Sequence, residues 1–375
     1  MRLALAAVWA VILAGGITQT ANGLQTDVLG VRASIEAFPA WMLGIIMASY
    51  YVGYSAGPLA SRGIIARFGH VLSIVIALVL AAAVIVLHGL LVAPVPWALL
   101  RVIDGLALSI VYVAIESWIN DRVENRVRGR IFSLYMVAQM AGMTVAQILF
   151  SMGNPKTLSL FALSAAIFVA GAIPAFAVRS KAPAMAPPVP FRLPQLFRVS
   201  PLGALTTILA GVSWSVVFTF GPVYAQKSGF SLSGVSLFMG LAMVGGAVMQ
   251  FPLGWISDLI GRRATIGWMS AGGIAASLFG LWTDGWPAIF PFAAALLTGG
   301  FIFPLYGLAV AHTNDRVAPG ARVAAAAGLV LLFGLGSIFG PLLTGWAISA
   351  MGAGGYFAVL AAVMGLSVTA TAFRR

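Results

Sequence analysis

Long apolar stretches, each about long enough to cross a lipid bilayer, follow one another along almost the whole chain. A membrane-spanning helix needs about 20 mostly apolar residues, because each residue adds ~1.5 Å against a hydrocarbon core ~30 Å thick. We therefore predict an all-α polytopic membrane protein with twelve transmembrane helices. The predicted spans are 3–23, 40–60, 71–92, 98–119, 131–152, 158–178, 201–226, 234–257, 266–283, 288–312, 323–349 and 353–373.

The first span has a second interpretation. Arg2, followed by an apolar stretch that ends near Thr20, also resembles a secretory signal peptide. Removing it would leave eleven spans and break the internal repeat described below. We therefore treat residues 3–23 as the first transmembrane helix.

Composition excludes several other classes of protein. Only 8% of the 375 residues are Asp, Glu, Lys or Arg, whereas soluble domains carry about 25%. The absence of cysteine excludes disulfide-stapled scaffolds, zinc–thiolate sites and iron–sulfur clusters. The net charge of +12 does not indicate a nucleic-acid partner, because the basic residues stand between apolar runs. We expect no cofactor.

The positions of the basic residues predict the orientation in the membrane. With the N-terminus inside, most of the 21 Lys and Arg residues fall in segments on the inner side. The exceptions are Arg32, Lys156, Lys227 and Arg101. The positive-inside rule thus places both termini in the cytoplasm. We predict the inner (plasma) membrane of a bacterium as the location, with membrane lipids as partners.

The chain divides into two related halves. Residues 179–200 are polar and rich in proline, which predicts an extended cytoplasmic linker between six-helix bundles at 1–178 and 201–375. At an offset of 194 residues, Gly105 meets Gly299 and the tetrapeptide at 120–123, NDRV, recurs at 314–317. Tyr112 likewise meets Tyr306, and Pro58-Leu59 meets Pro252-Leu253. Two parallel six-helix repeats are typical of transporters whose site lies between the halves.

Several motifs resemble those of the major facilitator superfamily over nearly the whole chain. The segment 254–263, GWISDLIGRR, resembles the loop signature G-x-x-x-D-x-x-G-R-R/K, and 101–105, RVIDG, resembles a pattern of span four. Span eleven carries a Gly-Pro run at 336–345. Glu116-Ser117, the arginines at 128 and 130, and Tyr135-Met136 are similar to the YcaD-like branch. The resemblance implies a monomeric, non-enzymatic secondary transporter of a small-molecule solute.

Two departures from the family patterns affect the interpretation. The first-half loop, 57–70, lacks the expected aspartate and is longer than its second-half partner. Span five has Gln147 where drug–proton antiporters usually have the proline of G-x-x-x-G-P. This second departure weakens the alternative that the chain is a multidrug antiporter.

By the same resemblance, spans one, four, seven and ten line the central cavity. Their side chains suit a site that hydrogen-bonds and stacks against an organic solute. The alternative is hydrogen bonding between helices, which is common for such residues in membranes. The substrate-binding candidates are Gln19, Asn22, Asp104, Tyr112, Trp214 and Tyr306, with Gln25 on span one and Asp27 just outside it.

Span four carries ionisable residues at 101, 104 and 116. Each would cost roughly 2.5–3.5 kcal/mol at the bilayer centre if unpaired, so we expect them to face the bundle interior. Arg101 and Asp104 are close enough to pair. One interpretation is that Asp104 takes a proton or binds a cationic substrate when the pair opens. The other is that it belongs to a fixed, structural ion pair. Glu116 is either a second proton-coupling site or the structural partner of Arg128 or Arg130.

A second set of charges predicts a cytoplasmic gate. The resemblance implies that Asp258 lies near a helix N-terminus, where the dipole favours an anion, and that Arg262 pairs with Asp315. It implies that Gly261 and Arg263 complete this loop, and that Arg67 and Asp121 form its first-half counterpart. Such contacts would hold the halves together on the cytoplasmic side.

We therefore predict a secondary transporter that moves a small organic solute by alternating access. The sequence has no Walker-type loop for ATP, so an ion or solute gradient must supply the energy. Proton coupling through Asp104 or Glu116 is a hypothesis. Few acids and several aromatic residues favour an amphipathic or weakly cationic solute. The alternatives are a multidrug or toxic-compound efflux antiporter and a non-transporting receptor or scaffold.

Overall fold

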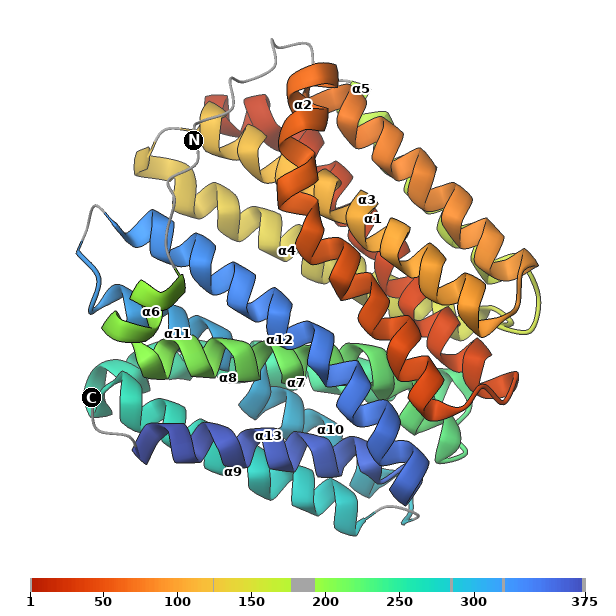
Figure 1. The fold of residues 1–375 in the computed structure, drawn as a ribbon, viewed down its shortest axis with the longest axis vertical. Coiled ribbons are helices and arrows are strands. Elements are labelled where there is room, and N and C mark those ends of the chain that lie inside the picture. Colours follow the sequence, from red (N-terminus) through yellow and green to blue (C-terminus); the bar gives the residue numbers. More distant parts are fainter. Residues whose placement is uncertain (1, 124, 177–192, 284–285, 319–320, 373–375) are drawn as a thin grey trace. The chain divides into compact units, whose positions relative to one another are not determined.

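The computed structural model describes residues 2–123, 125–176, 193–283, 286–318 and 321–372, and these ranges form helices joined by short turns (Figure 1). The helices are α1 (Arg2–Ile35), α2 (Ala40–Leu90), α3 (Pro94–Arg122), α4 (Asn125–Met152), α5 (Ser159–Phe176), α6 (Leu193–Val199), α7 (Pro201–Lys227), α8 (Leu232–Ile260), α9 (Arg262–Trp282), α10 (Ile289–Ile302), α11 (Leu305–Asn314), α12 (Arg322–Met351) and α13 (Gly355–Ala372).

The helices lie where the apolar spans predict them, although their number differs. Ten helical stretches within the described ranges are long and apolar enough to cross a membrane. One of them, α2, covers two predicted spans, and its backbone leaves the helical conformation between them at Gly69 (φ 74°, ψ 169°). Helices α10 and α11 together form another. The first predicted span lies within α1, which is not among the ten.

The predicted linker is only partly covered by the described residues. Its first part, up to residue 192, lies outside them. The remainder forms the short helix α6, so this part is helical rather than extended as predicted. The reason is a small apolar core: the side chain of Leu196 is fully buried against Ala204, Val317 and Leu329.

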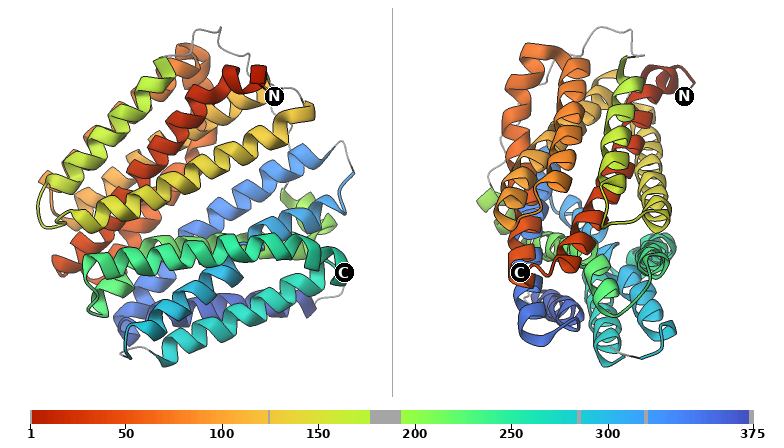
Figure 2. Two further views of the ribbon diagram at one scale, coloured as in Figure 1. Left: turned by 180° about the vertical axis from the view of Figure 1, so that it is seen from behind. Right: turned by 90° about the vertical axis from the view of Figure 1, so that its right-hand side faces the viewer.

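The chain forms two compact units. Unit 1 comprises Met1–Glu36 and Ser49–Pro187, and unit 2 comprises Ala37–Ala48 and Pro188–Arg375. Within unit 1, α1 packs against α4 and α5. Within unit 2, α7 packs against α12, α8 against α10, and α9 against α13 (Figure 2).

Close glycine contacts join α2 to α3 in unit 1. A Cβ on Gly53 would collide with the carbonyl oxygen of Val102, and a Cβ on Gly105 would collide with the carbonyl oxygen of Tyr50. Each helix thus presents a glycine to the backbone of the other. Small residues of this kind allow membrane helices to approach closely.

Unit 2 repeats the same arrangement between α8 and α10. A Cβ on Gly245 would collide with the carbonyl oxygen of Leu296, and a Cβ on Gly299 would collide with that of Ala242. Gly299 follows Gly105 by the predicted offset of 194 residues. The glycines of α2 and α8 are instead 192 residues apart. The internal repeat therefore extends from the sequence to the backbone packing of each unit.

The bend inside α2 and the bend after α8 are related by the same offset of 192 residues. Gly69 inside α2 has φ 74° and Gly261 after α8 has φ 84°, a left-handed conformation that glycine adopts without a steric penalty. These glycines are also 192 residues apart. The first-half loop is therefore equal in length to its partner, and the expectation that it is longer was wrong. The match of Pro58 with Pro252 does not follow this register.

Candidate functional site

A buried ion pair lies inside α3 of unit 1. The side chains of Arg101 and Asp104 are 1% and 0% exposed, and Arg101 Nη1 lies 2.7 Å from Asp104 Oδ2. The two residues are one helical turn apart, which brings their side chains onto one face. The sequence spacing correctly predicted this pair.

Two further helices hold the pair in place. Gln25 of α1 donates through Nε2 to Asp104 Oδ2 over 2.6 Å, and the guanidinium of Arg101 lies 4.3 Å from the ring centroid of Tyr50 on α2. Such a cation–π contact stabilises a desolvated guanidinium. The pair is thus the centre of a network that joins α1, α2 and α3.

The network has unused hydrogen-bonding capacity. Asp104 Oδ1, Arg101 Nε and Gln25 Oε1 are buried, and none has a hydrogen-bond partner within the described part of the chain. Buried polar atoms are nearly always paired in proteins. Asp104 Oδ1 and Gln25 Oε1 can therefore each accept a hydrogen bond from a water molecule or a polar group of a solute, and Arg101 Nε can donate one. Asp104 Oδ1 can also take up a proton.

The other substrate-binding candidates of unit 1 connect to this network. Gln25 Nε2 also lies 3.5 Å from Asn22 Oδ1. Tyr112 donates its hydroxyl to Gln19 Oε1 over 2.5 Å, and its ring meets Tyr54, which stacks on Tyr50 of the network. Gln19 and Asn22 are half-buried. We call these connected residues the polar patch: Gln19, Asn22, Gln25, Arg101, Asp104 and Tyr112.

Glu116 lies on the same helix, three turns beyond Asp104. It is half-buried, and none of the ion pairs among the described residues includes it. Arg130, one of its predicted partners, is exposed. The side chain of Arg128, the other, lies outside what the structure describes. The predicted pair with Arg130 is therefore not observed.

A second buried carboxylate belongs to Asp27, which was expected just outside span one. Because α1 continues to Ile35, Asp27 lies inside the helix rather than just outside the span, and it is 2% exposed. Gln147 of α4 donates through Nε2 to Asp27 Oδ2 over 2.7 Å. The signal that could have found this contact was Gln147 itself, a polar residue where the family pattern has proline.

In unit 2 the candidates Trp214 and Tyr306 belong to a cluster of rings. The centroid of Trp214 on α7 lies 4.9 Å from that of Phe303 and 5.9 Å from that of Phe333 on α12. Phe218 stacks on Phe303 at 5.3 Å, and Tyr306 meets Phe333 at 5.0 Å. All five rings are half-buried. We call them the aromatic patch.

Two features make the aromatic patch more than simple core packing. Phe303 stands where the helix is interrupted between α10 and α11, directly before Pro304. Trp214 Nε1 is buried without a hydrogen-bond partner among the described residues, although a buried indole N–H usually finds one. The patch therefore offers flat apolar surface together with one free donor.

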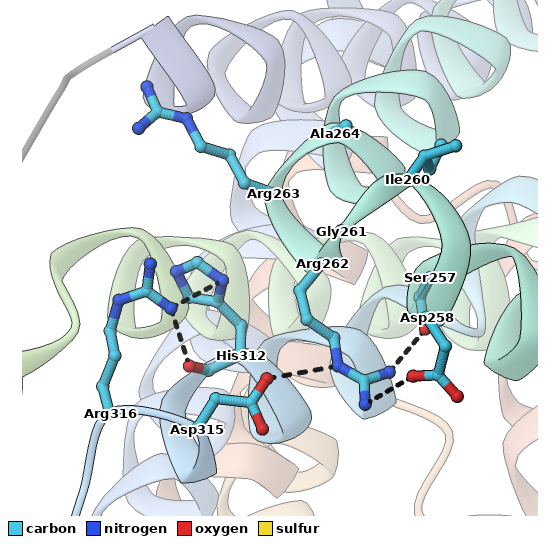
Figure 3. A pocket seen from close by; sticks show the side chains of 10 residues that line it. All are labelled: Ser257, Asp258, Ile260, Gly261, Arg262, Arg263, Ala264, His312, Asp315 and Arg316. Atoms are coloured by element: carbon cyan, nitrogen blue, oxygen red, sulfur yellow. Dashed lines mark hydrogen bonds and ion pairs between the residues drawn. The ribbon is translucent and has the colours of Figure 1, made fainter.

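The predicted gate loop is formed in unit 2 (Figure 3). Arg262 Nη2 lies 3.0 Å from Asp258 Oδ1 and its Nε lies 3.3 Å from Asp315 Oδ2. Arg262 also donates to Ser257 Oγ over 2.5 Å. Gly261 allows the sharp turn that places Arg262 at the start of α9. This arginine therefore joins the end of α8 to the end of α11.

The surroundings of the gate loop are polar and open. Arg263 Nε donates to the carbonyl oxygen of Thr371 in α13 over 2.9 Å, and Arg316 donates to the carbonyl oxygen of His312 over 3.1 Å. The residues of the loop line a cavity of about 610 Å³. Asp258 and Asp315 are 68% and 55% exposed, so each ion pair contributes only about 0–1 kcal/mol.

The predicted first-half counterpart of the gate is not observed. No ion pair joins Arg67 to Asp121 in the part of unit 1 that the structure describes. The guanidinium of Arg67 lies 5.4 Å from the ring centroid of Phe68, and Asp121 lies 3.8 Å from Arg122. Because α2 continues as a helix through residue 67, Arg67 occupies its exposed face.

Comparison with known proteins gives a consistent result. The family model described as the Major Facilitator Superfamily matches residues 4–329 and also residues 203–375. An uncharacterized MFS-type transporter, YcaD, of Escherichia fergusonii is 27% identical over 315 residues, which cover 82% of this chain and 80% of that protein.

Two solved structures share the fold. A crystal structure of the nucleoside transporter NupG has a TM-score of 0.82 at 14% identity, and the match covers 99% of this chain and 98% of that one. A crystal structure of a D-xylose-proton symporter has a TM-score of 0.74 at 16% identity and covers 98% and 97%. At these identities the likeness shows the fold alone.

Proposed function

We propose that this chain, which belongs to the Major Facilitator Superfamily, is a secondary transporter that carries a small organic solute by alternating access. The predicted family and its YcaD-like branch are confirmed by the relatives. The predicted all-α membrane fold is confirmed by the helices and by the solved structures. The chain is an integral membrane protein, and the relatives that it matches are described as MFS-type transporters.

The observation that supports this proposal most is the buried network around Asp104. Ionisable side chains inside a membrane are costly and usually mark a pathway for ions or solutes. Here an Arg–Asp pair is almost fully buried, and three polar atoms around it lack partners among the described residues. A purely structural pair would be expected to satisfy those atoms.

The two patches favour a particular class of solute. The polar patch offers amide, phenol and carboxylate groups for hydrogen bonding, and the aromatic patch offers ring faces and the Trp214 N–H. We propose a solute with a planar ring and several hydroxyl or amino groups, uncharged or weakly cationic. The solved structure of NupG is described as that of a nucleoside transporter. A nucleoside is therefore the first probe.

Coupling and orientation complete the proposal. Asp104 or Glu116 takes up the coupling proton, and Arg262 with Asp258 and Asp315 controls opening on the cytoplasmic side. We further propose a monomer in the bacterial inner membrane, surrounded by lipids, with both termini in the cytoplasm.

A second candidate function is the efflux of a toxic organic cation. Glu116 favours it, because a half-buried carboxylate without a partner among the described residues attracts a cation. The aromatic patch would also accept a flat cation through its ring faces. The two candidates therefore differ in which kind of solute binds more tightly.

The solute class is tested by thermal stability of the purified protein in detergent. A ligand that binds only the folded state stabilises it by about 2.7 kcal/mol at 100 times its Kd. We expect adenosine to raise the melting temperature by a few degrees, and D-xylose and ethidium to raise it less. We expect Trp214→Ala to abolish the adenosine shift, whereas Trp268→Ala, at a site 72% exposed, keeps it. A larger shift with ethidium would favour the efflux alternative.

A further inference from the structure

His70 occupies the position in unit 1 that Arg262 occupies in unit 2. It follows Gly69 directly, as Arg262 follows Gly261, and both glycines have a left-handed backbone. The two glycines are 192 residues apart, the same register as the close glycine contacts of α2 and α8. His70 is therefore the structural counterpart of Arg262, and the exposed Arg67 is not.

The contacts of His70 also correspond to those of Arg262. Arg262 reaches the end of α11 at Asp315. His70 reaches the end of α3, where its Nε2 lies 2.8 Å from Ser117 Oγ and its ring meets the edge of Trp118 at 5.6 Å. In each unit, the residue after the bend is thus joined to the helix that carries the repeated NDRV segment.

Burial and an unpaired ring nitrogen favour a neutral ring for His70. Ser117 Oγ lies 3.1 Å from the carbonyl oxygen of Ala114, to which its hydroxyl can donate, and it then accepts from His70 Nε2–H. His70 Nδ1 is buried without a partner among the described residues. An unpaired nitrogen lone pair costs less free energy than an unpaired N–H group, so this nitrogen carries no proton. The side chain is 2% exposed, which disfavours a charged ring.

None of the ion pairs among the described residues includes His70. Asp121, the counterpart of Asp315, acts on the ring electrostatically but pairs with Arg122 instead. The guanidinium of Arg122 lies 5.6 Å from the ring centroid of Trp118, and Arg67 lies over Phe68. The hydrogen bond between His70 and Ser117 therefore joins the α2 bend directly to the end of α3.

We infer that His70 is the gate residue of unit 1 and that it closes its gate with a neutral, buried hydrogen bond where unit 2 uses exposed ion pairs. The inference rests on the proposed transport function. The hydrogen bond between His70 and Ser117 lies within unit 1, so it acts on the gate by holding the α2 bend at Gly69 in the shape that the closed state requires. His70 is thus a positioning residue, and the two gates differ in chemistry although the repeat relates them.

The absence of natural cysteine allows a direct test with paired spin labels. Labels are attached after Arg62→Cys and Leu259→Cys, two exposed positions that directly follow the predicted spans 40–60 and 234–257 on the cytoplasmic side. Distance distributions are measured by electron paramagnetic resonance in proteoliposomes. We expect His70→Ala and Arg262→Ala each to increase the long-distance, cytoplasm-open fraction at least twofold. We expect Arg67→Ala to leave the distribution unchanged.

Two further variants separate gating from folding. His70→Gln keeps an N–H that can donate to Ser117, so we expect it to restore the distribution of the unsubstituted labelled protein. Ser117→Ala removes the acceptor and is expected to behave like His70→Ala. An unchanged distribution in both His70→Ala and Ser117→Ala, or an equal shift in Arg67→Ala, would overturn the inference.

Adenosine exchange by the same vesicles distinguishes this failure from that of the proposed function. If the unsubstituted labelled protein exchanges adenosine while His70→Ala leaves the distribution unchanged, only the role of His70 is overturned. If that protein exchanges none of adenosine, D-xylose and ethidium, the proposed function fails, and the inference fails with it.

Discussion

Asp104→Leu is expected to lower the free energy of unfolding by about 3–5 kcal/mol, because it leaves the guanidinium of Arg101 buried without its counterion. Arg101 is only 1% exposed, so it cannot turn toward water without moving the helices around it. Gln25 would also lose the oxygen to which it donates. The measurement is reversible unfolding of the reconstituted protein, compared with the unsubstituted chain.

The double variant, Arg101→Leu with Asp104→Leu, is the matched control. Removing both charges removes the uncompensated ion, and replacing a buried pair by apolar residues is often neutral or stabilising. We therefore expect the double variant to recover most of the lost stability. If the double variant is as unstable as Asp104→Leu, an uncompensated Arg101 is not the cause.

Transport by the double variant separates the two interpretations of the pair. If Asp104 carries the coupling proton, a stable double variant will have lost proton-driven transport. If the pair is only structural, the stable double variant will transport normally. Glu116→Gln, measured in parallel, applies the same test to the other candidate for proton coupling.

Gly245→Ala is expected to destabilise unit 2 by about 1–3 kcal/mol, because the added methyl group would collide with the carbonyl oxygen of Leu296. The backbones of α8 and α10 would have to separate, and the contact of Gly299 with Ala242 would loosen with them. The same measurement of unfolding checks this result. Gly105→Ala is expected to have a similar effect between α2 and α3 of unit 1.

Gly240→Ala on the same helix provides the control. Apart from its chain neighbours and the nearby backbone of its own helix, no atom lies within 4 Å of the position where its Cβ would stand. Alanine is favoured over glycine inside a helix by about 0.5–1 kcal/mol, so this variant is expected to be slightly more stable. If Gly245→Ala and Gly240→Ala changed stability equally, close helix packing at Gly245 would be refuted.

The sequence predicted those features that depend on local spacing. Hydropathy located the helices because each span needs a continuous apolar run. Arg101 and Asp104 were expected to pair because residues three apart share a helix face. The repeated NDRV segment gave the correct 194-residue register for the close-packed glycines of α3 and α10, because in each half the motif begins at the end of the membrane span that carries the glycine.

Features that depend on packing between distant segments could not be predicted in the same way. Gln25 reaches Asp104 across 79 positions of the chain, and Gln147 reaches Asp27 across 120. Neither contact has a local signature. The 192-residue register of α2 and α8 differs from the 194-residue offset of the NDRV repeat, so the offset found in the sequence did not align His70 with Arg262.

The central claim, that this chain is a transporter rather than a binding protein, is tested most directly by counterflow. Proteoliposomes are loaded with unlabelled adenosine and diluted into a trace of radiolabelled adenosine, without ATP or any ion gradient. A carrier that alternates between two sides will accumulate label transiently above its equilibrium level, and we predict this overshoot. Thermal stabilisation by adenosine without any uptake above that of protein-free vesicles would contradict the claim and indicate a receptor or scaffold.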